Sequence, residues 1–329
     1  MSALLQIRDL AITYDTPGGS VRALDDVELD VGAGESLGVV GESGSGKSTL
    51  GLAIGRLLPL NARRESGDLV IAGRSVFGLG DDAIRALRRR DLGFVFQNPM
   101  MALNPTMRIG QQVARAIGGG APDVSAHTLM ERVGLSEPDR VARSFPHQLS
   151  GGMAQRVAIG MAIAREPRLL ICDEPTASLD ASIRDQVLDL LLSLPTRTGA
   201  SVMILSHDLH AIAKHCDCVA VMYGGRVVEL GLSDQVFGAP CHPYTRALVA
   251  AAPGAEACGA VLEPIPGMPP VLRTRGAACA FEPRCHWAVE RCRHERPEGR
   301  RIAARCVQCH RAEEVAATTV AVGQTGVPE

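Results

Sequence analysis

The chain has 329 residues, of which 46% are hydrophobic, and this length suffices for about two domains with a buried core. Its 34 basic and 36 acidic residues nearly cancel, which argues against a surface that binds nucleic acid or an anionic membrane. No apolar run reaches the roughly 20 residues that span a bilayer, and the first residues lack the pattern of a signal peptide, so we expect a cytoplasmic protein.

The first informative segment is a short apolar stretch followed by a glycine-rich loop. Residues 36–40, SLGVV, favour a buried strand, and residues 41–48, GESGSGKS, match a Walker A loop. A helix is expected from about Lys47 to Leu58, with its positive end directed at an anion. In such a loop Lys47 reaches the β- and γ-phosphates, and the Ser48 hydroxyl binds Mg²⁺. We predict that the triphosphate site comprises Gly41, Glu42, Ser43, Gly44, Ser45, Gly46, Lys47, Ser48 and Thr49.

The segment HQLSGGMAQR has the features of a helix N-terminus. Ser150 is a good N-cap, and Gly151 and Gly152 expose backbone N–H groups where the helix begins. Apolar residues then recur at helical spacing to about Ala164.

Residues 169–174, LLICDE, predict a buried strand that ends in two carboxylates. Open α/β sheets place their ligands at this end of their strands. A buried Asp–Glu pair without a partner is costly, which favours a functional role. We expect Asp173 to hold Mg²⁺, directly or through water, and Glu174 to activate the attacking water.

These motifs, in this order and spacing, resemble the ATP-binding cassette (ABC) family. The resemblance implies an α/β P-loop NTPase cassette over residues 1–235, with a mixed sheet core and a helical subdomain at about 98–156. It also assigns nucleotide contacts to residues outside the Walker A loop and the Asp–Glu pair: Tyr14 for adenine, Gln97 with Mg²⁺, His207 for the γ-phosphate, and Ser150, Gly151, Gly152 and Gln155 of the family's signature motif, which residues 149–155 match. The catalytic residues that it implies are Glu174, His207 and Lys47.

Cassettes of this family pair head to tail, so that each signature completes the ATP site of the other subunit. ATP then holds the two subunits together, and hydrolysis removes it. The apolar stretch Pro99–Leu103 is similar to the region of peptide-importer ATPases that accepts a coupling helix from a membrane subunit, although ordinary core packing is the alternative.

Residues 236–310 resemble the small, loop-rich C-terminal extension of ATPases that serve oligopeptide, dipeptide and nickel importers. This implies a peripheral protein at the cytoplasmic face of the cell membrane. Its implied partners are a second, related ATPase, two transmembrane permeases and an extracytoplasmic solute-binding protein, without nucleic acid. The alternatives are a nickel or other solute importer, and a soluble ABC ATPase acting on nucleic acid or ribosomes.

Residues 279–309 of the extension contain five of the ten cysteines. Clustered cysteines in a cytoplasmic protein favour metal binding or catalysis over disulfides. The C-x5-C-x6-C spacing of Cys279, Cys285 and Cys292 is wide for structural zinc. The resemblance implies a [4Fe-4S] cluster with Cys309 as fourth ligand, while Cys306 competes for that position, and zinc or reduced structural thiols remain alternatives. We also expect that residues 1–235 form a complete cassette without the extension, and that residues 311–329 are disordered.

Overall fold

The computed structural model describes residues 3–118, 125–177, 179, 181–252 and 264–323. The chain divides into two compact units, which are described separately. The first comprises residues 1–4, 31–36 and 76–205, and the second comprises residues 5–30, 37–75 and 206–329. The second unit therefore contains both the Walker A loop and the C-terminal extension.

The second unit contains an antiparallel sheet of order β2-β1-β4-β5. Its strands are β1 (Ala3–Thr16), β2 (Gly19–Gly32), β4 (Ala62–Ile71) and β5 (Arg74–Ser75). Leu5, Ile7 and Leu10 of β1 are fully buried, so this sheet has a continuous apolar side.

A second group of strands in this unit has the order β11-β12-β10-β9-β3. They are β3 (Ser36–Val40), β9 (Cys218–Tyr223), β10 (Arg226–Leu232), β11 (Arg300–Ile302) and β12 (Arg305–Val307). β3 pairs with β9 in parallel, whereas β10 and β12 pair antiparallel, so a hairpin of the extension continues the cassette sheet.

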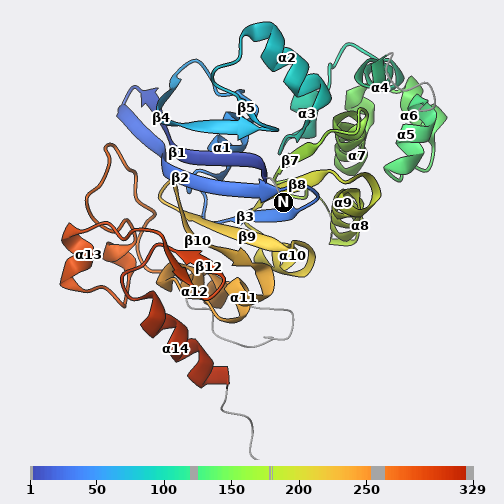
Figure 1. The fold of residues 1–329 in the computed structure, drawn as a ribbon. Helices are drawn as coiled ribbons and strands as arrows, with labels where there is room; N and C mark the ends of the chain where they lie inside the picture. The colour runs from blue at the N-terminus through green and yellow to red at the C-terminus, as the bar shows by residue number, and fades with distance from the viewer. Residues whose placement is uncertain (1–2, 119–124, 178, 180, 253–263, 324–329) are drawn as a thin grey trace, which may run out of the picture. The chain divides into compact units, whose positions relative to one another are not determined.

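The helices of this unit are short. They are α1 (Lys47–Ile54), α10 (Leu209–His215), α11 (Ser233–Gly238), α12 (Pro243–Ala251), the 3₁₀ turn η3 (Glu282–Arg284), α13 (Glu290–His294) and α14 (Ala312–Gly323). The sequence predicted disorder over residues 311–329. The structure has the helix α14 over residues 312–323 instead, which leads away from the strands (Figure 1) with Ala312 and Val315 buried at its start, and residues 324–329 lie outside the described residues.

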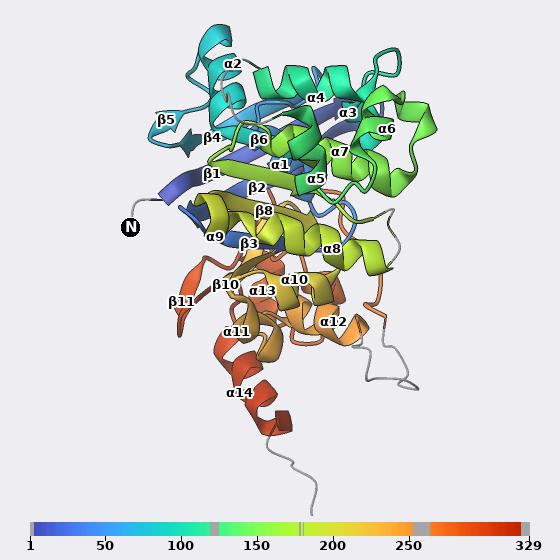
Figure 2. The ribbon, with the colours of Figure 1, turned by 90° about the vertical axis from the view of Figure 1, so that its right-hand side faces the viewer.

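The first unit contains the parallel strands β6 (Leu92–Val95), β7 (Leu169–Asp173) and β8 (Ser201–Ser206). β7 lies between the other two, and all five of its residues are buried. This double-sided burial explains the uninterrupted apolar run in the sequence. Helices α8 (Ala181–Leu192) and α9 (Leu194–Thr198) lie beside β8, as Figures 1 and 2 agree.

A helical group occupies the middle of the first unit, over residues 99–163. A subdomain bounded at about 98–156 stays a prediction. The group contains α3 (Pro99–Ala102), α4 (Ile109–Ile117), α5 (Ala126–Arg132), α6 (Pro138–Arg143), the 3₁₀ turn η2 (Pro146–Gln148) and α7 (Gly151–Ile163). Helices α4 to α7 contact one another (Figure 1), while α2 (Asp81–Arg90) packs on β6. Within the described ranges, no helix is long and apolar enough to cross a membrane.

Candidate nucleotide site and cysteine pocket

The Walker A loop connects the buried strand β3 to the helix α1. Its chain turns sharply at Gly46, which caps α1 with φ 105°. Lys47 is 7% exposed, and its ammonium donates to the carbonyl oxygens of Gly41 at 2.6 Å and Glu42 at 3.0 Å. The loop thus wraps around its own lysine, with Ser43, Gly44 and Ser48 exposed on the outside.

Tyr14 lies beside this loop, as its predicted role with adenine requires. Its hydroxyl and that of Thr49 in α1 are 3.2 Å apart and share a hydrogen bond. The residue is partly exposed.

In the first unit, Asp173 is the last residue of β7 and Glu174 follows it, while Gln97 lies two residues after the end of β6. Val95 pairs with Cys172, and Asp173 pairs with Leu205, so the ends of β6, β7 and β8 are level. Glu174 has a left-handed backbone with φ 46°, while its N–H donates to the Leu205 carbonyl at 2.8 Å. A non-glycine residue in this conformation costs free energy and is common at functional sites.

Ser150 caps α7 as predicted, because its hydroxyl accepts from the Met153 N–H at 3.3 Å. A cavity of about 200 Å³ lies at this helix terminus, and Ser150 and Gly152 line it. Gln155 lies elsewhere: its side chain is 1% exposed, and neither amide atom has a hydrogen-bond partner among the described residues. The structure therefore brings Ser150 and Gly152 together but not Gln155.

His207 is exposed in the turn that follows β8. The next residue, Asp208, caps α10 by accepting from the Ala211 N–H at 3.1 Å, and its own N–H donates to Ser206. These two bonds define the turn that presents the histidine.

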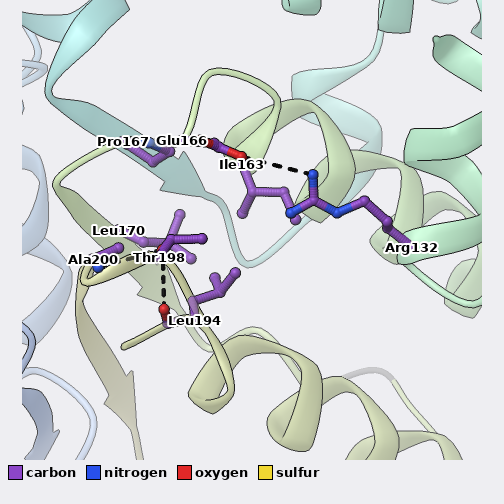
Figure 3. Close-up of a pocket in the computed structure, with 8 residues that line it drawn as sticks. All are labelled: Arg132, Ile163, Glu166, Pro167, Leu170, Leu194, Thr198 and Ala200. Atoms are coloured by element: carbon purple, nitrogen blue, oxygen red, sulfur yellow. Dashed lines mark hydrogen bonds and ion pairs between the residues drawn. The ribbon is translucent and has the colours of Figure 1, made fainter. Parts of the chain in front are cut away.

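The pocket in Figure 3 is a gap between packed side chains of the first unit. It lies by Leu170, near the start of β7, with Ile163, Pro167 and Leu194 around it. Its one ion pair, Arg132 with Glu166 at 3.9 Å, lies at the side. Because ligands of parallel sheets bind at the opposite, carboxyl ends of the strands, this pocket is not a candidate site.

The predicted coupling stretch has two faces. Pro99 and Leu103 are buried, whereas Met100 is 42% and Met101 82% exposed. Part of the apolar run is therefore core, and the two methionines form an apolar surface on α3.

The four predicted cysteine ligands line one pocket in the second unit. Cys279, Cys285, Cys292 and Cys309 all border it, together with Trp287. Cys306 does not, because it lies exposed on β12, opposite Leu230 of β10. This arrangement favours Cys309 over Cys306 as the fourth member of the group. Within the described ranges, no three His, Cys, Asp or Glu side chains meet as a single metal ion requires.

Burial raises the pKa of two of these thiols, to about 12 for Cys309 and about 11 for Cys285. Backbone N–H groups oppose this effect: that of Arg311 donates to the Cys309 sulfur at 3.4 Å, and that of Trp287 faces the Cys285 sulfur. Burial also raises the pKa of Cys279, and the N–H groups of Phe281 and Glu282 again oppose it. N–H donors directed at sulfur stabilise thiolates and tune iron–sulfur centres.

Two residues near the Walker A loop were not expected from the sequence. Arg284 and Tyr244, both in the extension, contact Glu42. Residues 1–235 are thus not independent of the extension at this loop. Nothing in the local pattern around either residue points to a partner some 200 positions away.

Comparison with known proteins gives family matches for both the cassette and the C-terminal extension. Residues 24–177 match the family described as ABC transporter, and residues 228–292 match the oligopeptide/dipeptide transporter C-terminal region. The oligopeptide transport ATP-binding protein OppD of Bacillus subtilis is 40% identical over 298 residues, with 88% of this chain and 83% of that protein covered.

The OppD proteins of Mycobacterium bovis and Mycobacterium tuberculosis are 42% identical, but this chain spans only 50% of their length. Among solved structures, the ATP-binding cassette MJ0796, a dimer bound to ADP and Pi, aligns with a TM-score of 0.62 at 28% identity. That alignment covers 70% of this chain and 98% of the cassette.

Proposed function

The chain belongs to the ABC transporter family, in its oligopeptide and dipeptide branch, and we propose that it hydrolyses ATP to power peptide uptake. The observation that carries this proposal is a Walker A loop in one compact unit with an extension of the peptide-transporter type. The relatives named for oligopeptide transport support peptides as the substrate class. A net charge of -2 gives no support to the alternative of a soluble ATPase acting on nucleic acid or ribosomes.

In this proposal the Walker A loop and the carboxylates Asp173 and Glu174 act on one nucleotide. Lys47 binds the β- and γ-phosphates, and Ser48, Gln97 and Asp173 would hold Mg²⁺, which shields the phosphate charge. Glu174 takes the proton of the attacking water, a role worth about 10²–10⁴ in rate. His207 contacts the γ-phosphate, and Tyr14 contacts adenine.

A second cassette completes the site. The capped N-terminus of α7, with Ser150, Gly151 and Gly152, would bind the γ-phosphate held by the partner subunit, because helix N-termini favour anions. We propose a related, non-identical ATPase as this partner. Of two transmembrane permeases, one would dock on the methionine surface of α3. A solute-binding protein would deliver the peptide, and this subunit would lie at the cytoplasmic face of the membrane.

We propose that the cysteine pocket holds a [4Fe-4S] cluster. Four thiols border the pocket, and the sulfur of Cys309 accepts a hydrogen bond from the backbone N–H of Arg311. A cubane needs one thiolate at each iron, so its ligands need not meet around one ion as they do for zinc. We propose Cys279, Cys285, Cys292 and Cys309 as its ligands.

The ATPase proposal is tested by Glu174→Gln in the assembled transporter. We expect normal ATP affinity with hydrolysis about 10²–10⁴ slower, whereas Lys47→Ala should lose most nucleotide affinity. Glu166→Gln is the matched control, because Glu166 has a similar left-handed backbone, with φ 49°. Wild-type turnover by Glu174→Gln would refute the proposed base.

A further inference from the structure

The C-terminal extension holds the Walker A loop through one ion pair. Glu42 is the second residue of that loop, and Arg284 lies in η3, beside Cys285. The guanidinium donates to both carboxylate oxygens of Glu42, at 2.7 Å and 3.0 Å. The Arg284 side chain is 4% exposed and that of Glu42 24%, so water screens this pair only weakly.

Arg284 is fixed independently of Glu42. Its Nε donates to the Pro266 carbonyl at 2.7 Å, and one terminal nitrogen lies 3.2 Å from the Tyr223 hydroxyl. The guanidinium also lies 5.7 Å from the centre of the Tyr223 ring. The arginine is therefore a rigid part of the extension, and the loop carboxylate binds to it.

The backbone of Glu42 is held as well. Its N–H donates to the hydroxyl of Tyr244 at 2.9 Å. The Tyr244 ring packs on Tyr223 with centroids 4.5 Å apart, and Phe281 contacts both rings at 5.2 Å and 5.4 Å. Phe281 also borders the cysteine pocket, so these aromatic rings connect the pocket with the loop.

The negative charge of Glu42 makes its contact with Arg284 important for ATP binding. A free carboxylate in a phosphate-binding loop repels the triphosphate, and a bidentate arginine neutralises it. The carbonyl of the same residue also binds the Lys47 ammonium. Displacement of Glu42 would therefore disturb the cation that binds the phosphates.

We propose that Arg284 is a positioning residue of the nucleotide site, through which the cysteine pocket sets the affinity of this subunit for ATP. The proposal rests on the proposed function, because it requires that the Walker A loop bind the nucleotide. The proposal applies whether the pocket holds a metal cluster or only thiols, because Cys285 follows Arg284 directly in the chain.

The test measures the equilibrium affinity of the full-length protein for a fluorescent ATP analogue. We expect Arg284→Met to weaken binding about tenfold, which corresponds to about 1.4 kcal/mol. Glu42→Gln has no carboxylate to repel the phosphates, so Arg284→Met should weaken binding less than threefold in that background. An equal loss in both backgrounds would mean that Arg284 only supports the fold, and would overturn the proposal.

The matched control is Arg296→Met. Arg296 also joins the extension to the cassette, but it pairs with Asp26 at 2.8 Å and not with the Walker A loop. We expect its ATP affinity to stay within twofold of wild type. Loss of affinity in Lys47→Ala but not in Arg284→Met would overturn this inference alone, whereas no loss in Lys47→Ala would overturn the proposed function.

The pocket is tested by a pair of cysteine variants. Cys285→Ser should weaken ATP binding several-fold in the wild-type background and have little further effect in Arg284→Met. Cys306→Ser, outside the pocket, should leave the affinity unchanged. Wild-type ATP affinity in Cys285→Ser would overturn the link between pocket and loop.

Discussion

The two glycines Gly44 and Gly46 of the Walker A loop should respond very differently to the same substitution. A Cβ at Gly46 would lie 2.6 Å from the carbonyl oxygen of Ala23, and the backbone there has φ 105°. A Cβ at Gly44 would meet nothing within 4 Å, at φ 79°. Both changes impose a left-handed backbone on alanine, but only Gly46→Ala also produces a clash with backbone atoms.

The free energies follow from these contacts. Left-handed strain costs about 1–2 kcal/mol, and the lost flexibility of the unfolded chain returns about 0.4–1 kcal/mol. Gly44→Ala should thus lower the free energy of unfolding by about 1 kcal/mol. Gly46→Ala adds overpacking of about 1–3 kcal/mol, for a total of about 2–4 kcal/mol.

The assay is the thermal midpoint of the nucleotide-free protein, which excludes any effect through ATP binding. At roughly 2–4 °C per kcal/mol, Gly46→Ala should lower the midpoint by about 5–15 °C and Gly44→Ala by about 2–4 °C. Equal midpoints for the two variants would refute the reasoning, because a Cβ at Gly46 meets atoms of Ala23, Leu24 and Met222, whereas a Cβ at Gly44 meets none.

Two further predictions concern the surfaces that the proposed function assigns. Met101→Glu places a charge on the exposed face of α3, so it should spare nucleotide binding but weaken capture of the permeases in a pull-down; the control Leu60→Glu, at another fully exposed apolar side chain, should not. Trp287 is the only tryptophan and borders the cysteine pocket, so removal of a cluster should brighten its fluorescence. Anaerobic protein should be brown with roughly four irons per chain. Cys309→Ser should abolish that colour and Cys306→Ser should not, while colourless protein with about one zinc would contradict the cluster.

Much of the nucleotide site was predictable from the sequence, because phosphate binding uses contiguous residues. A strand, a glycine loop and a helix that begins at Lys47 are local features, and the Ser150 cap is equally local. The two carboxylates at the end of β7 were predictable for a similar reason: the four-residue apolar run of residues 169–172 marks a buried strand, and Asp173 and Glu174 follow it at the edge of the sheet.

The tertiary structure alone decided how the extension meets the cassette. Arg284 and Glu42 are 242 positions apart, and no periodicity or spacing relates residues at that separation. Cys306 and Cys309 are both plausible by spacing, but one pairs in a β-hairpin and the other turns toward the pocket. The start of α14 is ordered because Ala312 and Val315 pack against the fold, which composition does not reveal. In each case the deciding free energy comes from packing and ion pairing between distant segments, and only the folded chain brings those segments together.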